Sequence, residues 1–106
     1  MARVSENLLK VIVQRIADVT HPEKIYLFGS CAWGVPDEQS DVDIFIIVPY
    51  SDQPAYRRTV PVYRALRGIG VPVDVIVQTR EEVERSGRVA TSLARKVLDQ
   101  GKVLYG

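Results

Sequence analysis

Three aspartates lie where the hydrophobic pattern predicts strands. Asp41-Val42-Asp43 opens a segment whose next five residues are apolar, and Asp74 interrupts a second apolar run. Because alternate residues of a strand share a face, Asp41 and Asp43 would present their carboxylates side by side while Val42 turns toward the core. Two carboxylates so close together repel each other, and this repulsion raises the pKa of one of them unless a cation neutralises the pair. Mg²⁺ prefers one or two carboxylates with waters and phosphate oxygens, so the pattern indicates a magnesium platform on a rigid element.

Each aspartate also has a simpler interpretation. An isolated Asp-x-Asp is more often an exposed strand start, but aspartate is depleted in strands and this pair runs directly into apolar residues. Burying an unpaired carboxylate is costly, so we expect Asp74 to be solvent-facing, hydrogen-bonded or close to a cation. Because Asp41 and Asp43 already require a neighbour, the site interpretation of Asp74 is favoured.

Gly29-Ser30 ends the segment before the aspartate pair. Glycine permits a positive φ and a close backbone approach to a ligand, and serine adds a hydroxyl and an N–H. If a helical turn starts here, its free N–H groups would suit a phosphate. The alternative is an ordinary strand-ending turn, so Gly29 and Ser30 are weak candidates by themselves.

Helices are predicted where apolar residues recur at helical spacing. The first covers 5–19, with Ser5 as its N-cap and His21-Pro22 as its stop. The second covers 55–69 and is either kinked at Pro61 or begins there. A short helix over 81–85 and a longer one over 90–100 follow, the latter with three residues facing inward: Leu93, Ala94 and Val97.

Strands are predicted over 24–28, 41–48 and 73–78, with a short edge strand over 103–105. The five continuous apolar residues of the second strand are typical of a strand covered on both faces. The order of elements predicts an α/β (α+β) fold, a small mixed β-sheet flanked by helices.

Composition limits the class of protein. The 106 residues predict a single domain over 1–106, and 46% hydrophobic with 25% charged residues is an ordinary globular balance. A net charge of +1 gives no strong nucleic-acid signal. The single cysteine excludes an intrachain disulfide, and no signal peptide or membrane-spanning run is evident, so we expect a cytoplasmic protein with no membrane association.

The combined motif resembles the stand-alone minimal nucleotidyltransferase (MNT, MntA-like antitoxin) branch of the DNA polymerase β-like nucleotidyltransferase superfamily. The matching text is Leu27–Gly34 followed by Ser40–Ile44, a Gly-Ser-x10-Asp-x-Asp pattern. The strand around Asp74 and the closing segment 101–105 also look like that family. The resemblance spans most of the chain and implies the polymerase β-like nucleotidyltransferase fold.

The resemblance also implies an activity. Gly29 and Ser30 would hold the triphosphate of ATP or another NTP. Asp41 and Asp43 would bind two Mg²⁺ ions, and Asp74 would help to hold the catalytic ion and accept the proton of the attacking hydroxyl. Members of this branch are commonly paired with a HEPN-domain toxin, and some transfer AMP to a tyrosine of that toxin. We therefore expect an Mg²⁺-dependent protein adenylyltransferase that acts as an antitoxin.

Two other functions stay open at this point. The same fold could mask a partner protein with weak or no catalysis, or it could transfer a nucleotide to a small molecule or an RNA end. A homodimer is also possible. Three arginines of the 55–69 segment, Arg57, Arg64 and Arg67, are interpreted mainly as a solvated helix face, with a partner-facing patch as the minority interpretation.

Overall fold

A computed structural model describes residues 5–29, 32 and 41–106 of the chain. The described part contains a four-stranded sheet in the order β3-β2-β1-β4. Its strands are β1 (Lys24–Phe28), β2 (Val42–Val48), β3 (Val73–Thr79) and β4 (Lys102–Tyr105). β2 runs parallel to β3, whereas β1 is antiparallel to both β2 and β4. The predicted mixed sheet is confirmed, including the edge position of β4.

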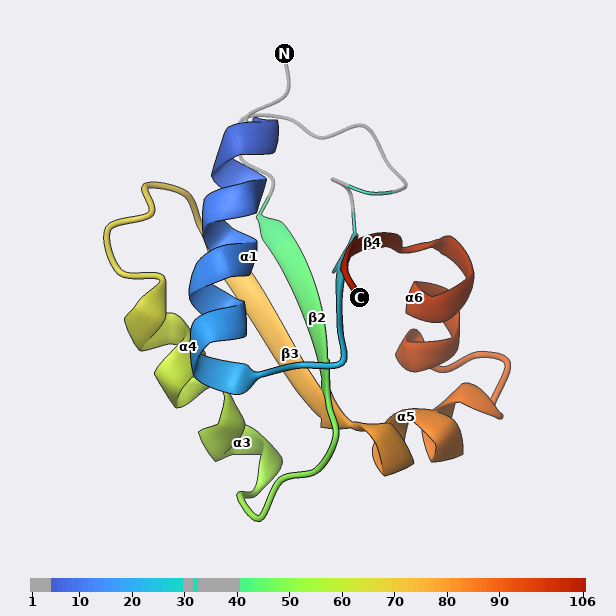
Figure 1. Ribbon diagram of the computed structural model, residues 1–106. Coiled ribbons are helices and arrows are strands. Elements are labelled where there is room, and N and C mark those ends of the chain that lie inside the picture. The colour runs from blue at the N-terminus through green and yellow to red at the C-terminus, as the bar shows by residue number, and fades with distance from the viewer. Residues whose placement is uncertain (1–4, 30–31, 33–40) are drawn as a thin grey trace.

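Helices cover both faces of this sheet (Figure 1). One face carries α1 (Glu6–Thr20), α3 (Ala55–Arg58) and α4 (Val60–Ala65), and the other carries α5 (Arg80–Gly87) and α6 (Leu93–Gln100). The core accordingly has two clusters, because alternate strand residues face opposite ways. One joins α1 and α4 to residues such as Ile44, and the other joins α5 and α6 to residues such as Phe45. Residues 44–48 of β2 are all buried, as predicted for a strand covered on both faces.

The ends of α1 follow the expected capping chemistry. The Ser5 side chain accepts a hydrogen bond from the Leu8 N–H at 3.1 Å, which satisfies one free donor of the first turn. His21 ends the helix in the left-handed conformation, with φ of 46°, and its N–H donates to the Ala17 carbonyl. His21 is exposed, as expected of a loop histidine.

The segment predicted as one helix over 55–69 forms two short helices. The break falls at Thr59, and Pro61 occupies the second residue of α4, where its missing N–H costs no intrahelical bond. α4 ends at Ala65 rather than at residue 69, and Gly68 follows with a φ of 80°. Pro61 therefore lies near the start of a new helix, the second of the two outcomes that the sequence allowed.

The last helix is also shorter than predicted. α6 begins at Leu93 rather than at residue 90, because the Ser92 side chain accepts from the Arg95 N–H at 3.1 Å and caps the helix. Ala94 and Val97 are buried as predicted, but the inward placement of Leu93 is wrong. Its side chain is 43% exposed at the first helical position.

Side chains from α3 and α4 occupy the outer edge of β3. The Tyr63 hydroxyl accepts a hydrogen bond from the Val75 N–H at 2.9 Å, and Arg58 donates to the Val77 carbonyl at 3.4 Å. Both backbone groups point away from β2, on the side where a further strand would pair. These two side chains therefore cover that edge of the sheet.

A buried arginine links α3 to the start of α5. Arg58 donates to the two carboxylate oxygens of Glu82 at 2.5 and 3.3 Å, and its side chain is only 9% exposed. Glu82 also accepts from the Thr79 N–H while the Thr79 hydroxyl accepts from the Glu82 N–H, a complete capping box. The Arg58 hydrogen bond, with the backbone bond from Thr79, lowers the pKa of Glu82 below its usual value of 4.5.

Glu82→Gln is expected to lower the free energy of unfolding by about 1–2 kcal/mol at pH 7, a value reduced for the partial exposure of Glu82. A lowered folded-state pKa stabilises fully above the unfolded value and is lost as the pH falls through the folded value. The difference between wild type and variant, measured by urea unfolding, should therefore shrink below about pH 4.5. Exposed Glu84→Gln on the same helix is the control, with little expected effect. If the difference in unfolding free energy between wild type and Glu82→Gln stayed the same down to pH 3, this account would be contradicted.

Within the part of the chain that the structure describes, no helix combines the length and the apolar character needed to cross a bilayer.

Candidate active site

The pairing of β2 with β3 places two of the predicted site residues beside each other. Asp43 and Asp74 are register partners on these parallel strands, both next to the strand starts. Neighbouring strands lie about 4.8 Å apart, and register partners share a face of the sheet. The carboxylates of Asp43 and Asp74 are therefore neighbours on the face that α5 and α6 cover further along.

Asp41 completes the group. It immediately precedes β2, and buried Val42 separates it from Asp43, as predicted for alternating residues. The Asp41 and Asp74 carboxyl groups lie within hydrogen-bonding reach of each other, a bond that forms only when one of the two is protonated. Asp74 is exposed on an edge strand, which fits the sequence expectation for this carboxylate. The structure thus brings together all three aspartates that the sequence singled out.

Gly29 borders the carboxylates from β1. It follows Phe28, the register partner of Asp43, and has a φ of 74°. A Cβ added at Gly29 would lie 2.1 Å from Asp43 Oδ2, far inside van der Waals contact. Only glycine lets the backbone of β1 come this close to the Asp43 carboxylate, because any side chain would collide with it. Ser30, the other predicted nucleotide-binding residue, lies outside the described residues.

An aromatic pair forms the floor of the site, a feature that the sequence analysis did not identify. Phe28 and Phe45 are both buried and meet edge to face, with ring centroids 6.2 Å apart. Phe28 on β1 is the register partner of Asp43. Phe45 lies two residues after Asp43 on β2, so its side chain is on the same face of the sheet as that of Asp43. The aromatic residues at 28 and 45 were visible in the sequence, but their shared face depends on the register between β1 and β2.

The electrostatics of the group are those of crowded carboxylates. Partial burial raises the pKa of Asp43, and the nearby Asp74 and Asp41 raise it further. The hydrogen bond to Asp41 raises the pKa of Asp74, with burial and the Asp41 charge adding to the effect. Among the described residues, no lysine or arginine is among the causes of either shift. Crowding of like charges is the arrangement that a divalent cation would relieve.

The three carboxylates would suit a metal ion that keeps water or phosphate oxygens among its ligands. Among the described residues, no three or more His, Cys, Asp and Glu side chains are arranged to hold a metal ion by themselves. Mg²⁺ ordinarily takes one or two carboxylates and completes its shell with waters and phosphate oxygens. Asp41, Asp43 and Asp74 would therefore need water or nucleotide oxygens to complete the shell of such an ion.

Known proteins share this arrangement of elements. The nucleotidyltransferase domain family matches residues 6–104. A Methanocaldococcus jannaschii protein named putative protein adenylyltransferase MJ0604 is 34% identical over 83 residues, which are 78% of this chain and 78% of that protein.

Two solved structures have similar folds. The crystal structure of a putative nucleotidyltransferase from Sulfolobus solfataricus is 32% identical, with a TM-score of 0.58 over 74% of this chain and 73% of that one. The toxin–antitoxin MntA-HepT structure is 20% identical, with a TM-score of 0.62 over 96% of this chain and 73% of that one. The predicted fold class is therefore confirmed. By its family match and by its relative in M. jannaschii, this chain belongs to the nucleotidyltransferase domain family and is an enzyme of that family.

Proposed function

We propose that this chain is an Mg²⁺-dependent protein adenylyltransferase, which transfers AMP, or another NMP, from the triphosphate to a protein hydroxyl. The proposal includes a role as the antitoxin of a HEPN-type toxin–antitoxin pair in the cytoplasm. The observation that carries the catalytic part is the register of Asp43 with Asp74, with Asp41 close enough to raise the pKa of Asp74.

In this reaction the acceptor hydroxyl oxygen attacks the α-phosphorus, and pyrophosphate leaves as the bond to the β-phosphate breaks. Two Mg²⁺ ions, when bound, supply charge stabilisation at the attacking and leaving oxygens. Asp41 and Asp43 would hold both ions, and Gly29, whose backbone lies against the Asp43 carboxylate, would contact the triphosphate from the end of β1. Asp74 would help to hold the catalytic ion and would accept the proton of the attacking hydroxyl. Ser30 completes the nucleotide-binding set of the proposal.

The choice of a protein acceptor is supported by the relatives. The M. jannaschii relative carries the name of a protein adenylyltransferase, and the MntA-HepT structure is that of a toxin–antitoxin. Phosphoryl-type transfer depends mainly on positioning and charge neutralisation, so a domain of this size suffices when a second protein brings the hydroxyl.

Incubation with ATP labelled at the α-phosphate tests the proposal. The chain is mixed with Mg²⁺ and with the purified protein encoded by the adjacent gene, and the products are separated by denaturing electrophoresis. Label on the neighbouring protein is expected, and EDTA should prevent it. Tight association without label would instead support a masking antitoxin. Label on RNA or on a small molecule would show that the acceptor is not a protein.

A further inference from the structure

A stripe of aromatic and basic side chains follows the outer side of α3 and α4. Thr59, between the two helices, keeps helical backbone angles, so the helical spacing continues across the break. Positions three or four apart share a side. The inward positions include Val62 and Leu66, both buried. The outward positions are all exposed, and we call them the α3–α4 stripe: Tyr56, Arg57, Val60, Tyr63, Arg64 and Arg67.

The segment that carries the stripe is strongly basic. Residues 53–73 contain four arginines and no acidic residue, which leaves 10 basic and 13 acidic side chains, a net charge of −3, for the rest of the chain. Arg58 is neutralised by Glu82. No ion pair with another described residue neutralises Arg57, Arg64 or Arg67, and the Arg57 guanidinium lies 6.0 Å from the centre of the Tyr56 ring. Exposed Tyr and Arg are the residue types that dominate binding energy at protein interfaces.

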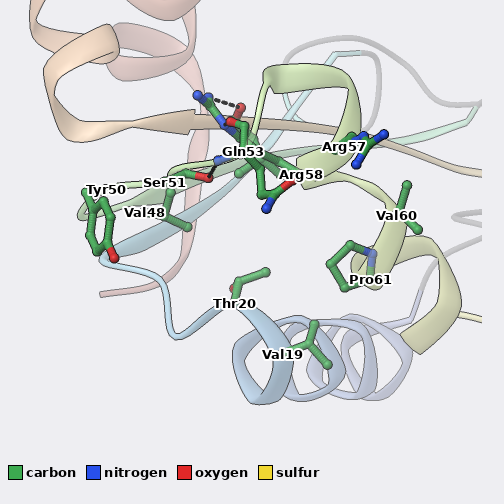
Figure 2. Close-up of a pocket in the computed structure, with 11 residues that line it drawn as sticks. Val19, Thr20, Val48, Tyr50, Ser51, Gln53, Arg57, Arg58, Val60 and Pro61 are labelled. Carbon is green, nitrogen blue, oxygen red and sulfur yellow. Dashed lines mark hydrogen bonds between the residues drawn. The ribbon is translucent and has the colours of Figure 1, made fainter.

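A pocket of about 570 Å³ opens beside the first half of the stripe. Figure 2 shows Val19 and Thr20 of α1 facing Val60 and Pro61 across this pocket. Val48 and Val77 add further apolar wall, and Arg57 also lines the pocket. A cavity with apolar walls and an arginine beside it fits an apolar or aromatic side chain whose neighbours are acidic.

The surface is held in place by the rest of the fold. The Tyr63 hydroxyl is fixed by the Val75 N–H. Arg15 of α1 donates to the carbonyl oxygens of Ala65 at 3.3 Å and Arg67 at 3.0 Å, which ties down the end of α4. A surface that is ordered before binding loses little conformational entropy when a partner arrives.

We infer that the α3–α4 stripe and its pocket dock an acidic segment of a partner protein, with one apolar or aromatic side chain of that segment in the pocket. From Arg57 to Arg64 the stripe spans about 10 Å at the helical rise, or two turns of a partner helix, and Arg67 extends it past the end of α4. The pocket lies at the Val48 end of β2, about 17 Å along the strand from Asp43. A side chain seated in the pocket is therefore remote from the carboxylate site, and the inference concerns binding and goes beyond the proposed transfer.

Binding is tested by titrating the ¹⁵N-labelled chain with three probes: a random glutamate–tyrosine copolymer, poly-glutamate and a 20-nucleotide oligouridylate. The copolymer is expected to bind most tightly and to shift the amide resonances of α3 and α4. The charge-reversal variant Arg57→Glu/Arg64→Glu/Arg67→Glu should weaken copolymer binding by about tenfold or more. The matched control reverses three exposed arginines of the opposite face, and Arg85→Glu/Arg88→Glu/Arg95→Glu should change binding less than about twofold.

A second variant tests the pocket. Val60→Gln is expected to bring copolymer affinity down to that of poly-glutamate, because the polar side chain removes apolar wall from the pocket. Equal binding of poly-glutamate and copolymer to the wild type, equal weakening by both charge-reversal variants, or tighter binding of oligouridylate would overturn the inference. Asp43→Asn separates it from the proposed function, since this variant should keep copolymer binding while it loses nucleotide transfer.

Discussion

The Asp41→Asn/Asp43→Asn variant is expected to transfer nucleotide at least roughly a thousandfold more slowly than the wild type. Asparagine keeps the shape of each side chain but removes the charge that would hold Mg²⁺ beside the triphosphate. The rate is measured as label from α-labelled ATP transferred to the neighbouring protein at saturating Mg²⁺. Exposed aspartates at the Val48 end of β2 provide the control, and Asp18→Asn/Asp52→Asn should retain the wild-type rate.

A stability measurement distinguishes this loss from misfolding. The folded-state pKa of Asp43 is raised, so its ionisation is harder in the folded chain than in the unfolded one. Asp43 therefore costs no stability at a pH below the usual Asp pKa, where it is protonated in both states. The cost in unfolding free energy grows as the pH rises through the folded-state pKa. In EDTA at pH 8, Asp43→Asn should therefore melt at the same temperature as the wild type or higher. A variant that still transfers nucleotide would refute the metal platform.

Gly29→Ala is expected to cost about 2–4 kcal/mol of stability and to reduce transfer by about a hundredfold or more. The alanine would take a φ of 74°, and its Cβ would fall 2.1 Å from Asp43 Oδ2. Either the strand end or the carboxylate must then move. Thermal unfolding and the labelled-ATP assay measure the two effects on the same preparation.

The chain contains a matched control for this substitution. Gly68 has a similar φ of 80° but no atom within 4 Å of an added Cβ. Gly68→Ala therefore carries the backbone strain without the contact, and should cost about 1–2 kcal/mol with transfer unchanged. If the two alanine variants behaved alike, the contact between Gly29 and Asp43 would have no special role.

Local chemistry explains why many of the elements could be predicted. A serine before an apolar helical pattern predicts an N-cap, and five successive apolar residues predict a strand buried on both faces. The structure confirms both at Ser5 and in β2. The helix predicted over 55–69 was the main error in the boundaries. Its apolar spacing continues through the break, whereas Pro61 and Gly68 set the actual ends of α4.

The sequence predicted which residue types form the candidate site, but not which strands pair to bring them together. The two-residue spacing of Asp41 and Asp43 predicts a shared face without any knowledge of the fold. The place of Asp74 depends on strand order, because only the parallel pairing of β2 with β3 puts it opposite Asp43. Strand order arises from packing between distant segments, so no local pattern specifies it. The closeness of Asp41 to Asp74 and the aromatic floor of Phe28 and Phe45 depend on the same pairing.

The covering of β3 by Tyr63 and Arg58 limits how copies of this chain can join. With that side of the sheet taken, β4 is the edge of the described sheet that stays open to a strand from another molecule, and its Val103 and Tyr105 are exposed. Two copies joined β4 to β4 would form one eight-stranded sheet with a covered β3 at each end. Such growth would stop at two molecules, so strand pairing through β4 would give a closed dimer rather than a fibre.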